Sequence, residues 1–365
     1  MTGRSIDLAL RTIAATMPLG VRERYLEEWR ADASGSSSLG LSPASIVRGA
    51  LAVSISINRT DPAVAGMPIS ALARRRGHWS LVLLIAAAPL ALTSFLYGGA
   101  LFVAPAIDLP LGLTIVSTLM GLVALVLLGG ALIAGIGATA ALVAEHGARG
   151  LLWAGGIALC AFVSLGVVAV MPFVSVIGVP LGLGLALVAG SRGAPTATRR
   201  TRGIVAAIVT IAALVIVPLQ VVTTLVWEPL TKVPGHSLAE INVALAAAGE
   251  GTLADPFVIG GGIVSLALAL AFSVVCLTPL GGRIPRRTLI ALSLSGVWLA
   301  SAIGWLGGFS IGMSIADTFM VSGGDSTAVS AVIAGWGSGC LSLALLVGAS
   351  PTARPPLCAG AGARA

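Results

Sequence analysis

Apolar residues along this 365-residue chain gather in long runs, and charged residues lie between those runs. A bilayer hydrocarbon core about 30 Å thick is crossed by about 20 residues of helix, at about 1.5 Å each. Eight runs reach or approach that length, which predicts an all-α fold, a polytopic transmembrane helix bundle of about eight spans. The runs are Trp79–Val103, Leu111–Val143, Leu151–Met171, Phe173–Ala189, Ile204–Trp227, Phe257–Leu277, Leu289–Met313 and Ala328–Val347.

The third and fourth runs are separated only by Pro172, and residues 151–189 carry no charge. A proline at this place is compatible with a tight hairpin between two spans, and equally with a kink inside one irregular span. The segment is therefore expected to form either two spans or one kinked span.

Composition supports the membrane class and excludes two others. Hydrophobic residues make up 57% of the chain and charged residues 10%, whereas a soluble domain has about 25% charged residues. So few charges cannot cover the surface of a soluble globule, and so apolar a chain is not disordered. The four cysteines show no paired spacing, so neither a disulfide framework nor a zinc site is expected.

The distribution of arginine predicts the orientation. Arg74, Arg75 and Arg76 precede the first run, which places that side in the cytoplasm by the positive-inside rule. Alternation across eight spans then puts 20 of the 21 basic residues and both termini in the cytoplasm, with Lys232 outside. Seven of the 14 acidic residues fall outside. We therefore expect a multi-pass protein of the bacterial cell (inner) membrane.

The runs divide the chain into parts with different expected structures. Residues 237–248, within the outer loop, are predicted to form a short surface helix. The parts are a cytoplasmic or interfacial helical module (1–78), spans one to four (79–190), a cytoplasmic Arg-rich linker (191–202), spans five to eight with an outer loop at 228–256 (203–349), and a disordered cytoplasmic tail rich in Pro, Gly and Ala (350–365).

Three short helices are predicted in the N-terminal module. The first covers Ile6–Thr16 and is ended by Pro18, and the second covers Leu19–Ala33. The third begins with Ser42 as N-cap and Pro43 at the first helical position. Its apolar face carries Ile46, Ala50, Val53 and Ile57, and Ser34–Gly40 is expected to be a flexible break before it.

The second helix carries the segment Arg22-Glu23-Arg24-Tyr25-Leu26-Glu27-Glu28-Trp29-Arg30-Ala31-Asp32, preceded by Met17-Pro18. This segment resembles a short cytoplasmic helical module that opens many uncharacterised actinobacterial multi-pass membrane proteins. It is also similar to the prefix segment of some ABC-type permeases. The resemblance is limited to about residues 17–60 and implies a bacterial membrane protein that works with a separate cytoplasmic subunit.

Tyr25 and Trp29 share one face of the second helix, and Arg24 and Glu28 form an i,i+4 pair on the other. The two aromatic side chains are candidates for docking a cytoplasmic partner. The alternative is an amphipathic helix that lies on the membrane or packs on its own neighbours.

A search for chemistry finds no catalytic, cofactor-binding or metal residue. No charged residue is expected well inside a span, which counts against a proton-coupled carrier. The loop residues Glu228, His236, Glu240 and Asp255 follow no ligand spacing and are expected to form a solvated acidic loop. No nucleotide-binding motif is present. We therefore expect a protein that is not an enzyme and has no cofactor.

Small residues recur every four positions in the seventh run, where they form one smooth helix face. Such a face lets another helix backbone approach closely. We expect it to pack against other helices of the same chain; a homodimer seam and a flexible gating helix are the alternatives. The residues are Gly296, Ala300, Gly304, Gly308 and Gly312.

Three functions stay open at this point. The leading one is a non-enzymatic permease-like or transport-accessory subunit, served by a separate cytoplasmic ATPase. The alternative is a membrane-embedded signalling or regulatory protein that senses through the outer loop and reports to a regulatory subunit. A third is a lipid-modifying membrane enzyme, whose only candidate acids are Glu228, Asp255, Asp317 and Asp325.

The expected partners follow from the same pattern. They are the lipid bilayer, an ATPase or regulatory subunit, and a second copy of the chain. Nucleic acid is not expected, because the arginines occur in short clusters between apolar spans.

Overall fold

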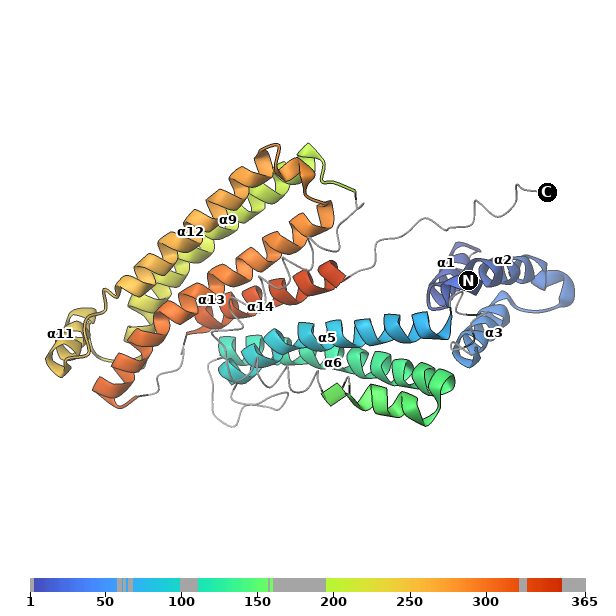
Figure 1. Cartoon of the computed structure of the whole chain (residues 1–365), viewed down its shortest axis with the longest axis horizontal. Coiled ribbons are helices and arrows are strands. Elements are labelled where there is room, and N and C mark those ends of the chain that lie inside the picture. Colours follow the sequence, from blue (N-terminus) through green and yellow to red (C-terminus); the bar gives the residue numbers. More distant parts are fainter. Residues whose placement is uncertain are drawn as a thin grey trace. The chain divides into compact units, whose positions relative to one another are not determined.

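The described part of the chain is all-α, as predicted. The computed structural model describes residues 3–57, 61, 64, 68–98, 111–156, 158, 159, 195–321 and 327–349. All secondary-structure elements named within these ranges are helices. Six helices are long and apolar enough to cross a membrane (Figure 1). They are α5 (Ile69–Gly98), α6 (Leu111–His146), α9 (Arg199–Val222, continuing to Lys232), α12 (Pro256–Leu277), α13 (Arg286–Phe319) and α14 (Ala328–Ala349).

The six helices correspond to the first, second and last four of the eight predicted spans, which supports a multi-pass membrane protein. Most of the third and fourth predicted spans lies outside the described residues, as do Asp108, Asp325 and the C-terminal tail. The chain divides into two compact units. One comprises Met1–Ser80 and Leu132–Ala161, and the other Leu81–Ala131 and Phe162–Ala365.

The N-terminal module of the first unit consists of α1 (Gly3–Ala15), α2 (Leu19–Gly35) and α3 (Pro43–Ser56). The three helices share one apolar core, in which Leu10, Ala14, Met17, Trp29 and Ala50 are buried. Two features of α3 are confirmed: Ser42 is its N-cap and accepts a hydrogen bond from the Ser45 backbone N–H, and Pro43 begins the helix.

The segment Ser34–Gly40 was expected to be a flexible break, and this expectation is wrong. Helix α2 continues to Gly35, and a 3₁₀ turn follows at Ser36–Leu39. Ser36 is buried, and its hydroxyl donates to the Ala33 carbonyl at 2.8 Å. A side-chain bond to the preceding turn satisfies one of the carbonyls left open at the end of a helix, so the chain continues in helical turns here.

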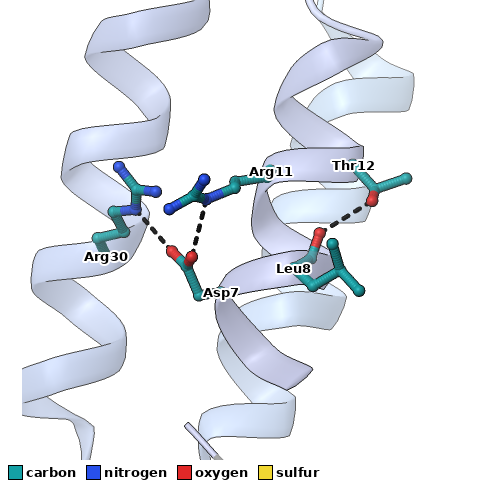
Figure 2. Close-up of polar contacts among 5 residues, drawn as sticks. All are labelled: Asp7, Leu8, Arg11, Thr12 and Arg30. Atoms are coloured by element: carbon teal, nitrogen blue, oxygen red, sulfur yellow. Dashed lines mark hydrogen bonds and ion pairs between the residues drawn. The ribbon is translucent and has the colours of Figure 1, made fainter. Parts of the chain in front are cut away.

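A charged contact links α1 to α2 on the surface of the module (Figure 2). Asp7 accepts a hydrogen bond from Arg30 of α2 at 2.8 Å and pairs with Arg11, one turn along α1, also at 2.8 Å. The hydrogen bond from Arg30 and the two positive charges lower the pKa of Asp7 below its ordinary value. The predicted surface pair of Arg24 with Glu28 is present at 2.8 Å.

We expect the α1–α2 contact to weaken in acid. A carboxylate whose pKa is lowered on folding stabilises the fold above its unfolded pKa of about 3.9, and that contribution is lost as the pH falls through the folded pKa. Hydrogen exchange of the α1 amides, corrected for intrinsic rates, should therefore rise as Asp7 is protonated. The Asp7→Asn variant should lose this pH dependence, while a variant of the exposed Asp32 should keep it. Equal pH dependence in both variants would contradict the role of Asp7.

The second unit contains α9, α12, α13 and α14, which lie side by side in Figure 1. Thr198 caps α9 through its hydroxyl, and Asp255 caps α12 by accepting from the Phe257 N–H at 2.7 Å. Past Val222, α9 continues through a π-helical turn, η2 (Thr223–Trp227), into the short α10 (Glu228–Lys232). The fifth span is therefore longer at both ends than the predicted Ile204–Trp227, because charged residues extend an apolar helix without breaking it.

Arginine side chains hold one end of this unit together. Arg202 donates to the carbonyl of Thr278 at 2.7 Å, and Arg287 donates to the carbonyl of Val347 at 2.6 Å. These carbonyls lie at the C-terminal ends of α12 and α14. A positive charge is favourable there, because it interacts with the negative end of the helix dipole. Backbone bonds also join residues 195–197 to residues 284–286. The basic residues in the first turns of α9 and α13 thus lie at the same end of the unit, as the predicted alternation requires for these helices.

The opposite end carries the outer loop of the prediction. The expected short helix is present as α11 (Leu238–Ala248), with a capping box between Ser237 and Glu240 at its start and Gly249 in the left-handed conformation at its end. Ile241 and Leu245 pack against Ile311 and Ile315 of α13, so the loop is folded onto the bundle.

Hydroxyl groups join α5 and α14 within the same unit. Thr93 and Ser338 share a buried hydrogen bond of 2.7 Å, and the Ser342 hydroxyl donates to the Ala86 carbonyl at 2.7 Å. Buried hydroxyls that bond across helices are a usual means of holding transmembrane helices together.

Candidate binding cavity

A polar cavity lies inside the second unit, toward the end that carries the outer loop and α11. It has about 530 Å³ of empty space, part of it open to solvent, and is enclosed by α5, α9 with its continuation, α13 and α14. Its polar wall includes the amide of Gln220, the hydroxyls of Thr223 and Thr224, and the charged groups of Glu228 and Lys232. Few polar groups are expected inside such apolar helices, so their convergence marks the site.

Glu228 is the most unusual of these residues. Only 6% of its surface is exposed, whereas the sequence suggested an outer-end residue in a solvated loop. That interpretation is wrong, because α9 continues past Trp227 as one helix and carries Glu228 into the bundle. Its charge thus lies among packed helices, where an ionised carboxylate requires hydrogen-bond donors.

Those donors come from the beginning of α14. The Glu228 Oε1 atom accepts from the Thr327 backbone N–H at 3.1 Å, from the Thr327 hydroxyl at 2.8 Å and from the Ser330 hydroxyl at 2.5 Å. The first N–H groups of a helix have no partner within it and carry partial positive charge. Glu228 therefore serves as a cap, supplied by another helix, for the first turn of α14. Lys232 follows one turn later and lines the same cavity.

The π-helical turn η2 determines which way these side chains face. It inserts one residue into the helical repeat between Thr223 and Trp227, immediately before Glu228. Thr223 is buried, and its hydroxyl donates to the Leu219 carbonyl at 2.7 Å. Turns of this kind rotate the following helical residues and occur frequently at functional sites.

The small-residue face of α13 forms the opposite wall. A β-carbon on Gly304 would lie 2.0 Å from the Gln220 Cδ atom, and one on Gly308 would lie 3.0 Å from the Thr224 methyl group. Gln220 also donates to the Ser301 carbonyl at 2.8 Å. These glycines leave room for the polar side chains of α9, and Gly312 lines the cavity beyond them. The expected packing on helices of the same chain accounts for these contacts.

The two remaining members of the face have different surroundings. Ala300 and Gly296 line a second, apolar cavity between α9, α12 and α13. A β-carbon on Gly296 would meet no atom within 4 Å. This half of the face is therefore not filled by a neighbouring helix.

The other candidate acids are dispersed. Glu240 accepts from the Ser237 N–H and hydroxyl, which lower its pKa below the ordinary value. Asp255 caps α12 and also accepts from the Ser310 hydroxyl, and Asp317 is exposed. His236 stacks edge-on against Phe319. Within the described ranges no three His, Cys, Asp or Glu residues are placed to share a metal ion.

The two aromatic docking candidates lie in the N-terminal module. Trp29 is 6% exposed and belongs to the core of the three helices, and Tyr25 packs against it with ring centroids 5.6 Å apart. Packing within the module accounts for Trp29, because a buried ring presents no surface to a partner. A docking role for the pair stays a prediction.

A signal for the cavity was present in the sequence and was missed. Gln220, Thr224, Glu228 and Lys232 recur every four residues, as the glycines of the seventh run do. A polar stripe on one transmembrane helix and a small-residue stripe on another are complementary, since the second leaves room for the first. The polar stripe was not predicted, because the apolar run of the fifth span ends at Trp227, one residue before Glu228.

The chain matches no family model, no curated protein and no solved structure. Its class therefore follows from the fold and the site. It is a polytopic helical membrane protein whose described part contains a polar cavity with a buried carboxylate.

Proposed function

We propose that the chain is a non-enzymatic, permease-like or transport-accessory protein of the bacterial inner membrane, and that the cavity around Glu228 binds a small polar solute. The observation that carries the proposal is the burial of Glu228 in a long apolar helix. Ionisable side chains inside membrane spans are costly and mark substrate or ion pathways by default.

The wall of the cavity defines the kind of solute. Glu228 and Lys232 supply opposite charges, and Gln220, Thr224 and Ser301 supply uncharged polar groups. The two charges together leave no net charge to be neutralised, which favours a neutral or zwitterionic molecule with several hydrogen-bonding groups. By the predicted orientation the solute would enter from outside the cell.

The test is a thermal-stability screen of the purified full chain against amino acids, polyols and sugars, with Glu228→Gln measured beside the wild type. We expect one of these classes to stabilise the wild type, by about 2.7 kcal/mol when its concentration is 100 times its Kd. Glu228→Gln should weaken the apparent affinity at least roughly tenfold, which corresponds to about 1.4 kcal/mol. Glu240→Gln, a change in the exposed capping box, should bind as the wild type does. Stabilisation by no solute, or equal stabilisation of Glu228→Gln, would contradict the proposal.

A second candidate function is sensing through the outer loop. The observation in its favour is the apolar cluster that joins α11 to the end of α13, through Ile241, Leu245, Ile311 and Ile315. A ligand that shifts α11 would act directly on α13, which lines the cavity. Co-purification of an ATPase with the full chain would favour the transport role, and co-purification of a transcription regulator would favour sensing.

A further inference from the structure

The apolar cavity between α9, α12 and α13 is a second cavity of the bundle. It has about 580 Å³ of empty space, part of it open, and no charged residue lines it. Its lining residues come from the middle stretches of the three helices, around Ala213, Ser265 and Gly296. These stretches are apolar enough to lie in the hydrocarbon core of a membrane. The cavity is therefore available to a molecule that dissolves in lipid.

The hydroxyl of Ser265 lines this cavity and makes no hydrogen bond with any residue that the structure describes. Ser265 is only 4% exposed. Serines elsewhere in these helices bond to the preceding turn, as Ser273 does to the Ala269 carbonyl at 2.8 Å and Ser293 to the Ile290 carbonyl at 2.7 Å. A buried hydroxyl without a partner is unfavourable, and native proteins have few of them. Its missing partner is therefore the feature to be explained.

We propose that this cavity binds an aliphatic chain that carries one uncharged oxygen, and that this oxygen hydrogen-bonds to the Ser265 hydroxyl. A charged group is disfavoured because the cavity holds no residue of opposite charge. The ester region of a membrane lipid and a free long-chain alcohol share the required chemistry. The site is separate from the Glu228 cavity and does not depend on its function.

The walls are suited to a chain that enters from the bilayer. Leu268 lines the cavity and is 50% exposed, so one edge lies on the side of α12 that faces outward. A ligand entering there would not pass through water. On α13 the cavity meets Gly296, where a β-carbon would touch nothing within 4 Å. That empty space is where the aliphatic carbons would lie.

The test is photolabelling of the purified full chain with hexadecan-1-ol that carries a diazirine in the middle of its chain. We expect labelled peptides from α9, α12 and α13, and loss of the label when unlabelled hexadecan-1-ol is added in excess. Ser265→Ala should lower the labelling at least threefold without lowering the melting temperature, because it removes a hydroxyl that has no partner within the described ranges. Labelling spread evenly over the outward-facing residues, and not reduced by competition, would overturn the proposal.

A matched pair of glycine variants tests the location. Gly296→Leu places a side chain in the cavity from a position where the β-carbon meets no atom within 4 Å, and it should abolish labelling. Gly260→Leu, whose β-carbon also meets no atom within 4 Å and which lies on α12 away from the cavity, should not. If Gly296→Leu does not fold, Ser265→Ala decides alone. Competition by added phospholipid as well as by hexadecan-1-ol would identify a bilayer lipid as the occupant, and competition by the alcohol only would identify a free amphiphile. Full labelling of folded Gly296→Leu would overturn the location.

Discussion

Replacing both Gly304 and Gly308 with leucine is expected to abolish most of the folded protein. A β-carbon at Gly304 would lie 2.0 Å from Gln220 Cδ, and one at Gly308 would lie 3.0 Å from the Thr224 methyl group. Gln220 would be driven from its hydrogen bond to Ser301, and the branched Thr224 cannot move away without α9. Overpacking costs about 1–3 kcal/mol at each site, which is large against a total stability of about 5–15 kcal/mol.

The measurement is the yield of monodisperse protein after extraction in detergent. The double variant should fall at least tenfold below Gly260→Leu, a control whose β-carbon meets no atom within 4 Å. If the double variant instead keeps its yield and loses only a cross-linked dimer band, the small-residue face of α13 serves contact between two copies. Packing of α13 on α9 would then not be its role.

Glu228→Ala is the second change with a large expected effect, a fall of roughly 3 kcal/mol in the free energy of unfolding. The substitution leaves the Thr327 N–H and the hydroxyls of Thr327 and Ser330 without the oxygen that now accepts from them. Thr327 and Ser330 are part-buried, so donors that lose this acceptor carry part of the cost of desolvation. Glu228→Gln keeps an acceptor oxygen and should lose less than half as much.

Thermal unfolding in detergent would measure the effect. Glu240→Ala is the comparison. It removes a carboxylate from the same end of the unit, but this carboxylate is exposed and belongs only to the capping box of its own helix, α11. Loss of this exposed carboxylate should lower the melting temperature less than loss of the buried Glu228, because water can replace an exposed hydrogen-bond partner. Equal melting temperatures for the two alanine variants would show that Glu228 does not hold the first turn of α14.

The helices themselves were predictable because the bilayer imposes a length. Leu111–Val143 was expected and Leu111–His146 is found, and Phe257–Leu277 is found as Pro256–Leu277. Helix ends that carry charged residues were predicted short of their true position. The fifth span was predicted to end at Trp227, because the apolar run stops at the first charged residue, whereas the helical backbone hydrogen bonds continue to Lys232. The cap of α3 was also predictable, since Ser42 and Pro43 act within one turn of their own positions.

The cavity was not predictable from local pattern alone. Glu228 is buried because Thr327, 99 residues later in the chain, brings its N–H and hydroxyl to the carboxylate. Burial of Trp29 likewise depends on α1 and α3 covering it. The polar stripe that runs from α9 through η2 into α10, and the glycine stripe on α13, are both visible in the sequence. Pairing them required the two helices to be assumed neighbours, which no single stretch of chain establishes.

The end of the second unit where Arg202 and Arg287 bind the helix-end carbonyls affects how the helices can move. Backbone hydrogen bonds join residues 195–197 to residues 284–286, and Arg202 and Arg287 bind carbonyls at the ends of neighbouring helices. These contacts fix this end of the unit, so that a tilt of α9 would pivot about it. Helix α9 has 24 residues and is therefore about 36 Å long, at about 1.5 Å per residue. A tilt of about 5° would displace the end of α9 that is farther from the arginines by about 3 Å. That is the diameter of a water molecule. Small angular changes at the stiff end would therefore suffice to widen or close the space around Glu228.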